Sequence, residues 1–187
     1  MKNILFQTLK LTLLTLLLFS GIYTLVILFI AQATPGGGKG KKLTQHGITV
    51  GYENIGQKFT ADRYFNSRPS AVNYNADGSG ASNKGPSNAE YLILVKERID
   101  SFLVRNPGIS KSEIPVEMVT ASGSGLDPDI SSSAALIQVK RIAKIRGMNE
   151  DKLKSLIIEQ KEKSLLGFFG PEKINVLKLN IALDNLN

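Results

Sequence analysis

The sequence predicts an α+β fold class, with a single N-terminal transmembrane helix followed by one compact extracytoplasmic α+β domain. Two observations lead to this prediction: an uncharged apolar run near the N-terminus, and mixed helical and strand-like patterns after a glycine- and lysine-rich hinge. We therefore divide the 187 residues into an N-terminal tail and transmembrane helix (1–33), a flexible tether (34–47) and the domain (48–187).

The apolar run covers residues 11–30 and contains neither a charged residue nor a proline. A helix of this length rises about 1.5 Å per residue and so spans roughly 30 Å, the thickness of the hydrocarbon core of a bilayer. A helix also satisfies its own backbone polar groups in lipid. The run therefore predicts a membrane span, with the lipid bilayer as its partner.

A cleaved signal peptide is the alternative interpretation of this run. Lys2 supplies a positive N-terminal region, and Ala31-Gln32-Ala33 has the small-x-small pattern of a signal-peptidase site, after which the mature chain would begin at Thr34. The run exceeds the usual apolar length of about 7–15 residues, which favours a retained anchor. Under both interpretations the domain lies outside the cytoplasm. The lysines on the two sides of the apolar run do not by themselves decide the orientation of the helix in the membrane.

Composition and charge exclude several functions. The net charge is +7, but basic residues are interleaved with acidic ones, which indicates a solvated mixed surface, and we expect no nucleic-acid partner. There is no cysteine, and the single histidine, His46, lies in or beside the tether. Histidine-based triads, thiol chemistry and multi-histidine metal sites are therefore excluded, and we expect no catalytic residues and no metal of the chain's own. The segment 35–42 also lacks the P-loop pattern.

The sequence of the first part of the domain, residues 47–86, predicts little regular structure. Apolar residues with glycine punctuation over 47–59 indicate short strands or a bend. The segment 64–86 is long, irregular and rich in Asn, Ser and Gly, and loops of that length in compact domains are usually functional or disordered. Because it carries Tyr64, Phe65 and Arg68, we expect an ordered binding surface, with the arginine either anchoring a partner or forming a local salt bridge.

Helices and one strand follow the loop. Ser87 and Glu90 fit a capping box, so we expect a helix to begin there and to end at Asn106-Pro107-Gly108. The apolar residues after Pro115 predict a short strand over Val116–Thr120.

The C-terminal third predicts three more elements. Ser131 or Ser132 can cap a second helix that ends at Gly147, and Asn149 opens a third. The tail, 174–186, alternates like a strand and also repeats like a helix, and we interpret it as a short strand passing into a terminal helix.

The loop over residues 122–129 (Ser-Gly-Ser-Gly-Leu-Asp-Pro-Asp) is a candidate ligand-binding loop. It follows a predicted strand and leads into a helix, so its backbone amides and the hydroxyls of Ser122 and Ser124 could hold an anion or cofactor. Asp127 and Asp129 could bind a cation, although two carboxylates do not make a full set of oxygen ligands. A structural turn with a helix cap is the alternative.

Several short motifs occur in a characteristic order along the chain. They are Ile55-Gly56-Gln57, Tyr64-Phe65-Asn66-Ser67-Arg68-Pro69-Ser70, Ser82-Asn83-Lys84-Gly85-Pro86-Ser87, Val119-Thr120-Ala121-Ser122-Gly123-Ser124-Gly125-Leu126-Asp127-Pro128, Arg141-Ile142-Ala143, Gly167-Phe168-Phe169-Gly170 and Asn175-Val176-Leu177. Together they resemble the family of C chains of the Kdp potassium-transporting ATPase, over nearly the whole chain including the N-terminal span.

The resemblance implies a non-catalytic accessory subunit of a bacterial high-affinity K⁺ uptake complex. It implies partners of three kinds: a channel-like K⁺-translocating subunit, a P-type ATPase subunit and a small single-span subunit. It also implies ATP as a cofactor shared with the ATPase subunit, whose affinity for ATP the family is described as raising. The implied location is the bacterial cell (inner) membrane, with the N-terminus cytoplasmic and the domain extracytoplasmic.

Candidate residues follow from these interpretations. The candidates for partner binding are Tyr64, Phe65, Arg68, Asp127 and Arg141. The candidates for cofactor binding are Ser122, Ser124 and Asp127. Small or polar residues that would let another helix approach the span are Thr12, Thr15, Ser20 and Gly21. The alternative function is an independent, membrane-tethered, extracytoplasmic ligand-binding protein, whereas a hydrolase would need a nucleophile and base that the sequence does not offer.

Overall fold

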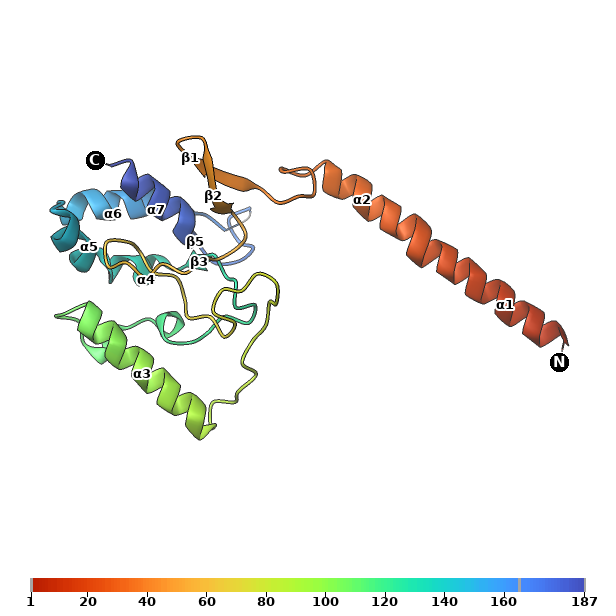
Figure 1. The fold of residues 1–187 in the computed structure, drawn as a ribbon, viewed down its shortest axis with the longest axis horizontal. Helices are drawn as coiled ribbons and strands as arrows, with labels where there is room; N and C mark the ends of the chain where they lie inside the picture. Colours follow the sequence, from red (N-terminus) through yellow and green to blue (C-terminus); the bar gives the residue numbers. More distant parts are fainter. Residues whose placement is uncertain (1, 165, 187) are drawn as a thin grey trace. The chain divides into compact units, whose positions relative to one another are not determined.

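The computed structural model describes residues 2–164 and 166–186. The chain divides into two compact units, Met1–Lys42 and Leu43–Asn187, which we describe separately (Figure 1).

The first unit is dominated by one uninterrupted helix over Lys2–Gln32. It comprises α1 (Lys2–Leu16), a π-helical turn η1 (Leu17–Tyr23) and α2 (Thr24–Gln32), and none of the side chains in these three elements is buried. The helix is long and apolar enough to cross a membrane, since an 18-residue stretch of it has a mean hydropathy of 2.6. The predicted span is therefore helical. Its π-helical turn contains Gly21, and such turns within α-helices occur frequently at functional sites.

The segment predicted as a flexible tether, 34–47, is shorter than expected. Strand β1 (Lys42–Gln45) falls inside it and pairs with β2 (Ile48–Tyr52) across a two-residue turn at His46-Gly47. Both turn residues have positive φ, which suits the two-residue turns of hairpins. The prediction failed because the alternating half-buried side chains of β1 outweigh the glycine-rich composition that precedes them.

Residues 53–88, all of them described, contain neither helix nor strand, as the sequence predicts for 64–86. They are nevertheless held against the rest of the domain. Gly56 N donates to Leu126 O at 2.7 Å, and a Cβ at residue 56 would lie 2.4 Å from the carbonyl oxygen of Asp127. Only glycine allows the two loops to approach this closely.

Helix α3 (Ala89–Arg105) begins one residue later than the predicted capping box. Asn88 is the N-cap, and its Oδ1 accepts a hydrogen bond from Tyr91 N at 2.9 Å. Glu90 instead pairs with Lys84 at 2.7 Å. The only buried side chain of α3 is Phe102, so the helix packs through its C-terminal half while its N-terminal half extends away from the body of the domain (Figure 1).

The strand predicted over Val116–Thr120 is wrong. Two 3₁₀ turns, η2 (Lys111–Glu113) and η3 (Val116–Met118), occupy this region. The amides of Met118, Val119 and Thr120 all bond within the turn rather than to a neighbouring strand. The β-branched residues favour a strand locally, but the sheet is formed by other segments.

The predicted second helix is two helices. Ser131 Oγ accepts a hydrogen bond from Ala134 N at 3.1 Å and caps α4 (Ser132–Leu136), as the sequence predicts. A turn at Ile137-Gln138 then separates α4 from α5 (Val139–Arg146). Gly147 ends α5 with a φ of +65°, the left-handed conformation expected of a helix stop.

The last elements complete a small sheet with helices against it. They are β3 (Asp129–Ile130), α6 (Glu150–Glu159), β4 (Lys161–Glu162), β5 (Lys173–Asn175) and α7 (Val176–Asp184). Asn149 caps α6 as predicted. The sheet has the order β3-β5-β4 with antiparallel pairing, and Ile130 and Lys161 both align with Ile174. The predicted short strand and terminal helix of the tail are confirmed.

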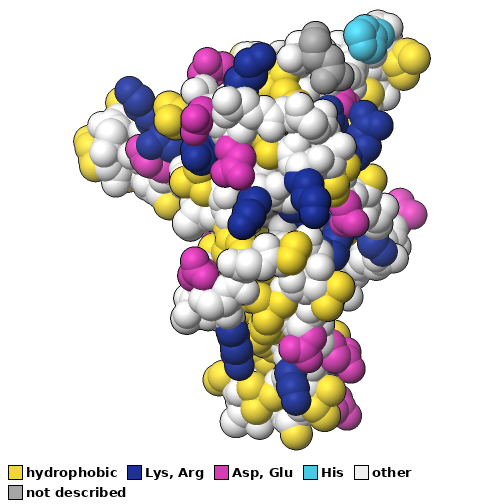
Figure 2. All heavy atoms as spheres, turned by 90° about the vertical axis from the view of Figure 1, so that its left-hand side faces the viewer, with side chains coloured by type: hydrophobic (Ala, Val, Ile, Leu, Met, Phe, Trp, Pro, Cys, Tyr) yellow, Lys and Arg dark blue, Asp and Glu magenta, His cyan; other side chains and the backbone are white. Residues whose placement is uncertain are grey.

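The core lies between this sheet and helices α4 to α7. Its fully buried large side chains are Phe65, Ile142, Leu153, Ile157, Ile174, Leu179, Leu183, Gln138 and Val176. On the face of the molecule shown in Figure 2, basic and acidic side chains are interleaved around apolar patches.

Candidate functional site

The segment 64–70, predicted as a binding surface, is anchored in the core at Phe65. The Phe65 side chain is 0% exposed. Its backbone N–H donates to Asn180 Oδ1 at 2.9 Å, and Asn180 Nδ2 donates back to Phe65 O at 3.0 Å. A buried α7 side chain thus replaces the neighbouring strand that this extended backbone lacks. Phe65 is a core residue whose side chain is not available to a partner, contrary to its selection as a contact.

Arg141 is likewise a structural centre rather than a surface group. Its guanidinium donates to the Asp62 carbonyl, to Asn106 Oδ1 at 2.9 Å and to Gln138 Oε1 at 2.8 Å. Burial, aided by nearby Arg105 and opposed by Asp62, lowers the Arg141 pKa to about 10, so the group stays protonated at neutral pH. Arg141 therefore joins α5 to the end of α3 and to the start of the 64–70 segment.

Tyr64 lies half-buried in a charged cluster next to α7. Its hydroxyl donates to Asp184 Oδ2 at 2.9 Å, and Arg146 Nη2 donates to Asp184 Oδ1 at 2.6 Å. The guanidinium groups of Arg63 and Arg146 lie 5.2 Å and 5.0 Å from the centroid of the tyrosine ring. Burial alone would raise the pKa of Asp184, but the bonds from Arg146 and Tyr64 and the nearby arginine charges hold it below its usual value.

Arg68 and Asp127 are brought together, so the two loops predicted as partner surfaces form one surface. Arg68 Nη1 lies 2.9 Å from Asp127 Oδ2, and both side chains are about one quarter exposed (26% and 28%). The Tyr74 hydroxyl donates to the carbonyl of Arg68. Arg68 Nε is buried and has no hydrogen-bond partner among the residues that the structure describes.

The 122–129 loop forms hydrogen bonds within itself, as expected for the alternative interpretation of this loop as a structural turn. Ser122 Oγ accepts from Gly125 N at 2.9 Å, and Ser124 Oγ accepts from Leu126 N at 3.1 Å. Asp127 Oδ1 accepts from the amide of residue 129 at 3.1 Å. The amides of residues 125, 126 and 129 are thus engaged within the loop and are not free to bind a nucleotide phosphate.

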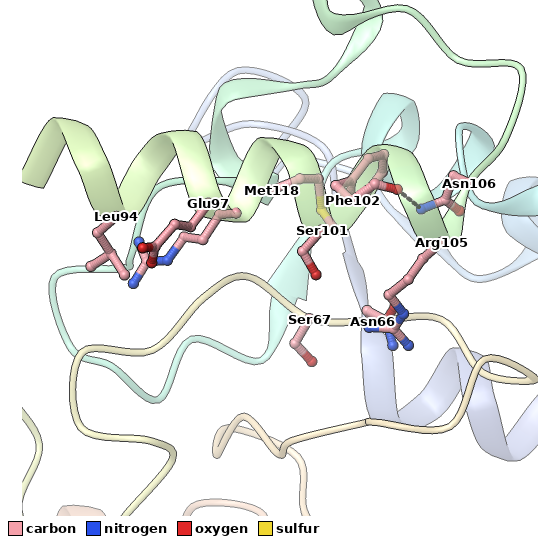
Figure 3. A pocket seen from close by; sticks show the side chains of 10 residues that line it. Asn66, Ser67, Leu94, Glu97, Ser101, Phe102, Arg105, Asn106 and Met118 are labelled. Atoms are coloured by element: carbon pink, nitrogen blue, oxygen red, sulfur yellow. Dashed lines mark hydrogen bonds between the residues drawn. The ribbon is translucent and has the colours of Figure 1, made fainter.

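A cleft of about 280 Å³ lies between α3 and the 64–70 segment. Figure 3 shows Ser101 and Arg105 of α3 pointing toward Ser67 and Asn66 across it. The residues that line the cleft are Asn66, Ser67, Leu94, Glu97, Arg98, Ser101, Phe102, Arg105, Asn106 and Met118.

A second cleft of about 260 Å³ adjoins the first and shares Arg98 and Arg105 with it. It is also lined by Lys58 and Arg68, so four basic side chains meet beside Ser67. Part of this charge is compensated, since Arg105 pairs with Asp62 and Arg68 with Asp127. We call the two clefts together the basic cleft. Its donors fit an anionic group such as a phosphate or a carboxylate better than those of the 122–129 loop do.

Sequence reasoning missed Lys58, Arg98 and Arg105. The signal for the latter two was the helical spacing of Leu94, Arg98, Ser101 and Arg105, which places them on one face of α3.

Among the described residues, no cluster of three or more His, Asp or Glu side chains is placed to hold a metal ion. His46, which the sequence places in or beside the tether, lies in the turn between β1 and β2.

Comparison with known proteins gives a consistent result. Residues 5–185 match the family model described as KdpC, the K⁺-transporting ATPase c chain. The chain is 58% identical over 186 residues to the potassium-transporting ATPase KdpC subunit of Flavobacterium johnsoniae, with 100% of both chains covered. It is 51% identical over 183 residues to that of Bacteroides thetaiotaomicron, covering 96% of this chain and 97% of the relative. It is 46% identical over 178 residues to that of Caldanaerobacter subterraneus, covering 95% and 92%.

Proposed function

Because the chain belongs to the KdpC family, the c chains of K⁺-transporting ATPases, we propose that it is a non-catalytic accessory subunit needed to assemble an ATP-driven K⁺-uptake complex. The observation that carries this proposal is the match over residues 5–185, which includes the apolar helix as well as the domain. The partners proposed are a channel-like K⁺-translocating subunit, a P-type ATPase subunit and a small single-span subunit.

The helix over Lys2–Gln32 is the part we propose to pack against the K⁺-translocating subunit. All of its apolar side chains are free to contact lipid or another helix. The π-helical turn carries Ser20 and Gly21, whose small side chains would let a second helix approach closely. A Cβ at residue 21 would meet only Leu17 Cδ1, at 3.7 Å, so a larger side chain here would project from the helix rather than disrupt it.

The surface around the Arg68–Asp127 pair is the part of the domain that we propose to contact the complex. It joins segments 59 residues apart and leaves both charges partly exposed. Tyr64 lies half-buried in the same 64–70 segment, whereas Phe65 and Arg141 would act only by holding this surface in place.

We further propose that the subunit raises the affinity of the ATPase subunit for ATP, with the nucleotide shared between the two chains. Arg98 and Arg105 of the basic cleft would be the groups that hold phosphate oxygens. Bound ATP would supply the negative charge that this cleft is suited to neutralise. Nucleotide binding requires ATP on the side of the membrane where the domain lies. Because the sequence predicts an extracytoplasmic domain, this proposal requires that nucleotide reach that side.

Assembly can be tested by co-purification from detergent extract. A tagged full-length chain is expected to bring down the K⁺-translocating and ATPase subunits, and removal of residues 1–33 is expected to abolish this. Gly21→Leu should weaken it, whereas Leu14→Ile, which keeps the helix surface apolar, serves as the matched control. Unchanged assembly after deletion of the helix would refute its anchoring role. A full-length chain that brings down neither subunit would instead favour an independent tethered binding protein.

A further inference from the structure

The loop between β4 and β5 carries apolar side chains that the fold leaves outside the core. We define the apolar tip as residues 166–170, Leu-Gly-Phe-Phe-Gly. The side chains of Leu166, Phe168 and Phe169 are 75%, 71% and 56% exposed. The two phenyl rings contact each other with centroids 4.3 Å apart. The two rings therefore form an exposed apolar patch close in sequence to exposed Leu166, and such patches often mark an interaction site.

The apolar tip has a fixed place in the domain. Gly167 N donates to Ser164 O at 3.0 Å, which closes a turn at its start. At its far end the chain enters β5, where Asn175 Nδ2 donates to Glu53 O at 2.7 Å, directly after β2. The tip therefore lies at the edge of the domain that carries the β1–β2 hairpin, as the ribbon also shows (Figure 1).

We propose that the apolar tip inserts into the surface of the lipid bilayer that holds the N-terminal helix. The helix over Lys2–Gln32 is suited to cross that bilayer, and only residues 33–41 separate it from the first strand of the hairpin. Even fully extended, a connection of this length reaches no more than about 35 Å. The domain is thus held within reach of lipid whatever else it contacts.

The chemistry of the tip fits lipid better than a protein partner. None of the side chains of residues 166–170 has a hydrogen-bond donor or acceptor, whereas protein interfaces combine an apolar centre with directional polar contacts. Phenyl and aliphatic groups, in contrast, insert readily at the boundary between headgroups and acyl chains.

The charged residues next to the apolar tip are also compatible with contact to a lipid bilayer. Lys163 is exposed and forms no ion pair with any residue that the structure describes, so it is free to face anionic headgroups. Its neighbours Lys161 and Glu172 pair with each other at 2.8 Å and so leave little net charge of their own.

Tryptophan fluorescence tests the proposal directly, because the chain contains no tryptophan. Full-length Phe168→Trp would be reconstituted in vesicles of phosphatidylcholine and phosphatidylglycerol, with a nitroxide on some acyl chains close to the headgroup. Its emission is expected to shift to shorter wavelength and to lose most of its intensity when the nitroxide lipid is present. Val104→Trp is the matched control, since residue 104 is 81% exposed on α3, and it should keep its emission.

A second variant separates insertion from simple proximity to the membrane. In the Phe168→Trp background, Phe169→Asp should restore the emission, because a carboxylate at the tip opposes insertion. Equal nitroxide quenching and equal acrylamide accessibility of Phe168→Trp and Val104→Trp would overturn the proposal. So would protection of Phe168→Trp that appears only when other subunits are added. Because the measurement uses this chain alone, its failure would leave the proposed accessory function unaffected.

Discussion

Arg68 and Asp127 form a 2.9 Å ion pair across 59 residues of sequence and join the two loops that carry most of the candidate partner contacts. The pair is only partly exposed, and the carbonyl of its arginine accepts a hydrogen bond from Tyr74. Both interpretations of Arg68 that the sequence allowed are thus compatible with one geometry. The local salt bridge is present, and its exposed side remains available to a partner.

Loss of either member of this pair should affect the complex more than the fold. Partly exposed ion pairs contribute no more than about 1 kcal/mol, so Arg68→Ala and Asp127→Ala should leave the domain folded. Each is expected to reduce co-purification with the other subunits and K⁺-stimulated ATPase activity. Lys154→Ala, which removes the exposed Lys154–Asp151 pair on α6, is the control for loss of a surface charge. Wild-type assembly and activity in both loop variants would contradict the assignment of this surface.

Gly56→Ala should destabilise the domain because of a single added methyl group. The new Cβ would lie 2.4 Å from the backbone oxygen of Asp127, and a backbone atom cannot yield as a flexible side chain can. Overpacking of this kind costs about 1–3 kcal/mol. Gly123→Ala is the matched control, since its Cβ would meet nothing within 4 Å. Thermal unfolding of the full-length chains in detergent compares the two, and equal midpoints would show that the close approach of the loops is not required.

Arg141→Met should be among the most destabilising substitutions in the domain. It keeps much of the side-chain volume but leaves Asn106 Oδ1 and the Asp62 carbonyl without the donor that Arg141 supplies. Gln138 Oε1, in contrast, keeps the bond from Asn66 N. Each buried polar group left unsatisfied costs about 1–3 kcal/mol. The exposed neighbour provides the control, and Lys140→Met should change the stability by less than about 0.5 kcal/mol. Similar unfolding midpoints for the two variants would contradict the structural role of the arginine.

The stability of the domain should depend on pH through Asp184. Its folded-state pKa lies below the unfolded value of about 3.9, so the unfolded chain binds more protons in acid. The stabilisation is therefore complete above the unfolded pKa and is lost as the pH falls through the folded pKa. Asp184→Asn should lower stability at neutral pH and flatten its loss below about pH 4. Tyr64→Phe, which retains the carboxylate and the Arg146 bond, should keep most of the acid dependence, and an unchanged profile for Asp184→Asn would refute this origin.

Local signals in the sequence were sufficient to locate three helix ends in the C-terminal half, although they did not show the break between α4 and α5. Ser131, Asn149 and Gly147 act through hydrogen bonds and backbone conformations within a few residues of themselves, so their spacing predicts helix ends directly. The same locality explains the one-residue error at α3, where Asn88 caps the helix in place of the adjacent Ser87.

Long-range contacts explain the remaining differences. Phe65 and Arg141 look like surface candidates in sequence, but hydrogen bonds of Phe65 with Asn180, and of Arg141 with Asp62 and Asn106, place them inside the fold. The residues Val116–Thr120 have strand propensity, but they pair with no strand in the part of the chain that the structure describes. Arg98 and Arg105 face the 64–70 segment only because Phe102 sets the orientation of α3. Local periodicity places Arg98 and Arg105 on one face of α3, but it does not show which segment that face meets.

The ATP dependence of K⁺-stimulated ATPase activity tests the central claim most directly. The complex would be assayed with and without this chain, and with Arg98→Ala in place of the native chain. An accessory subunit that raises ATP affinity predicts a higher KM for ATP in its absence and little change in kcat at saturating ATP. The same KM with and without the chain, in a complex that is otherwise intact, would contradict the account.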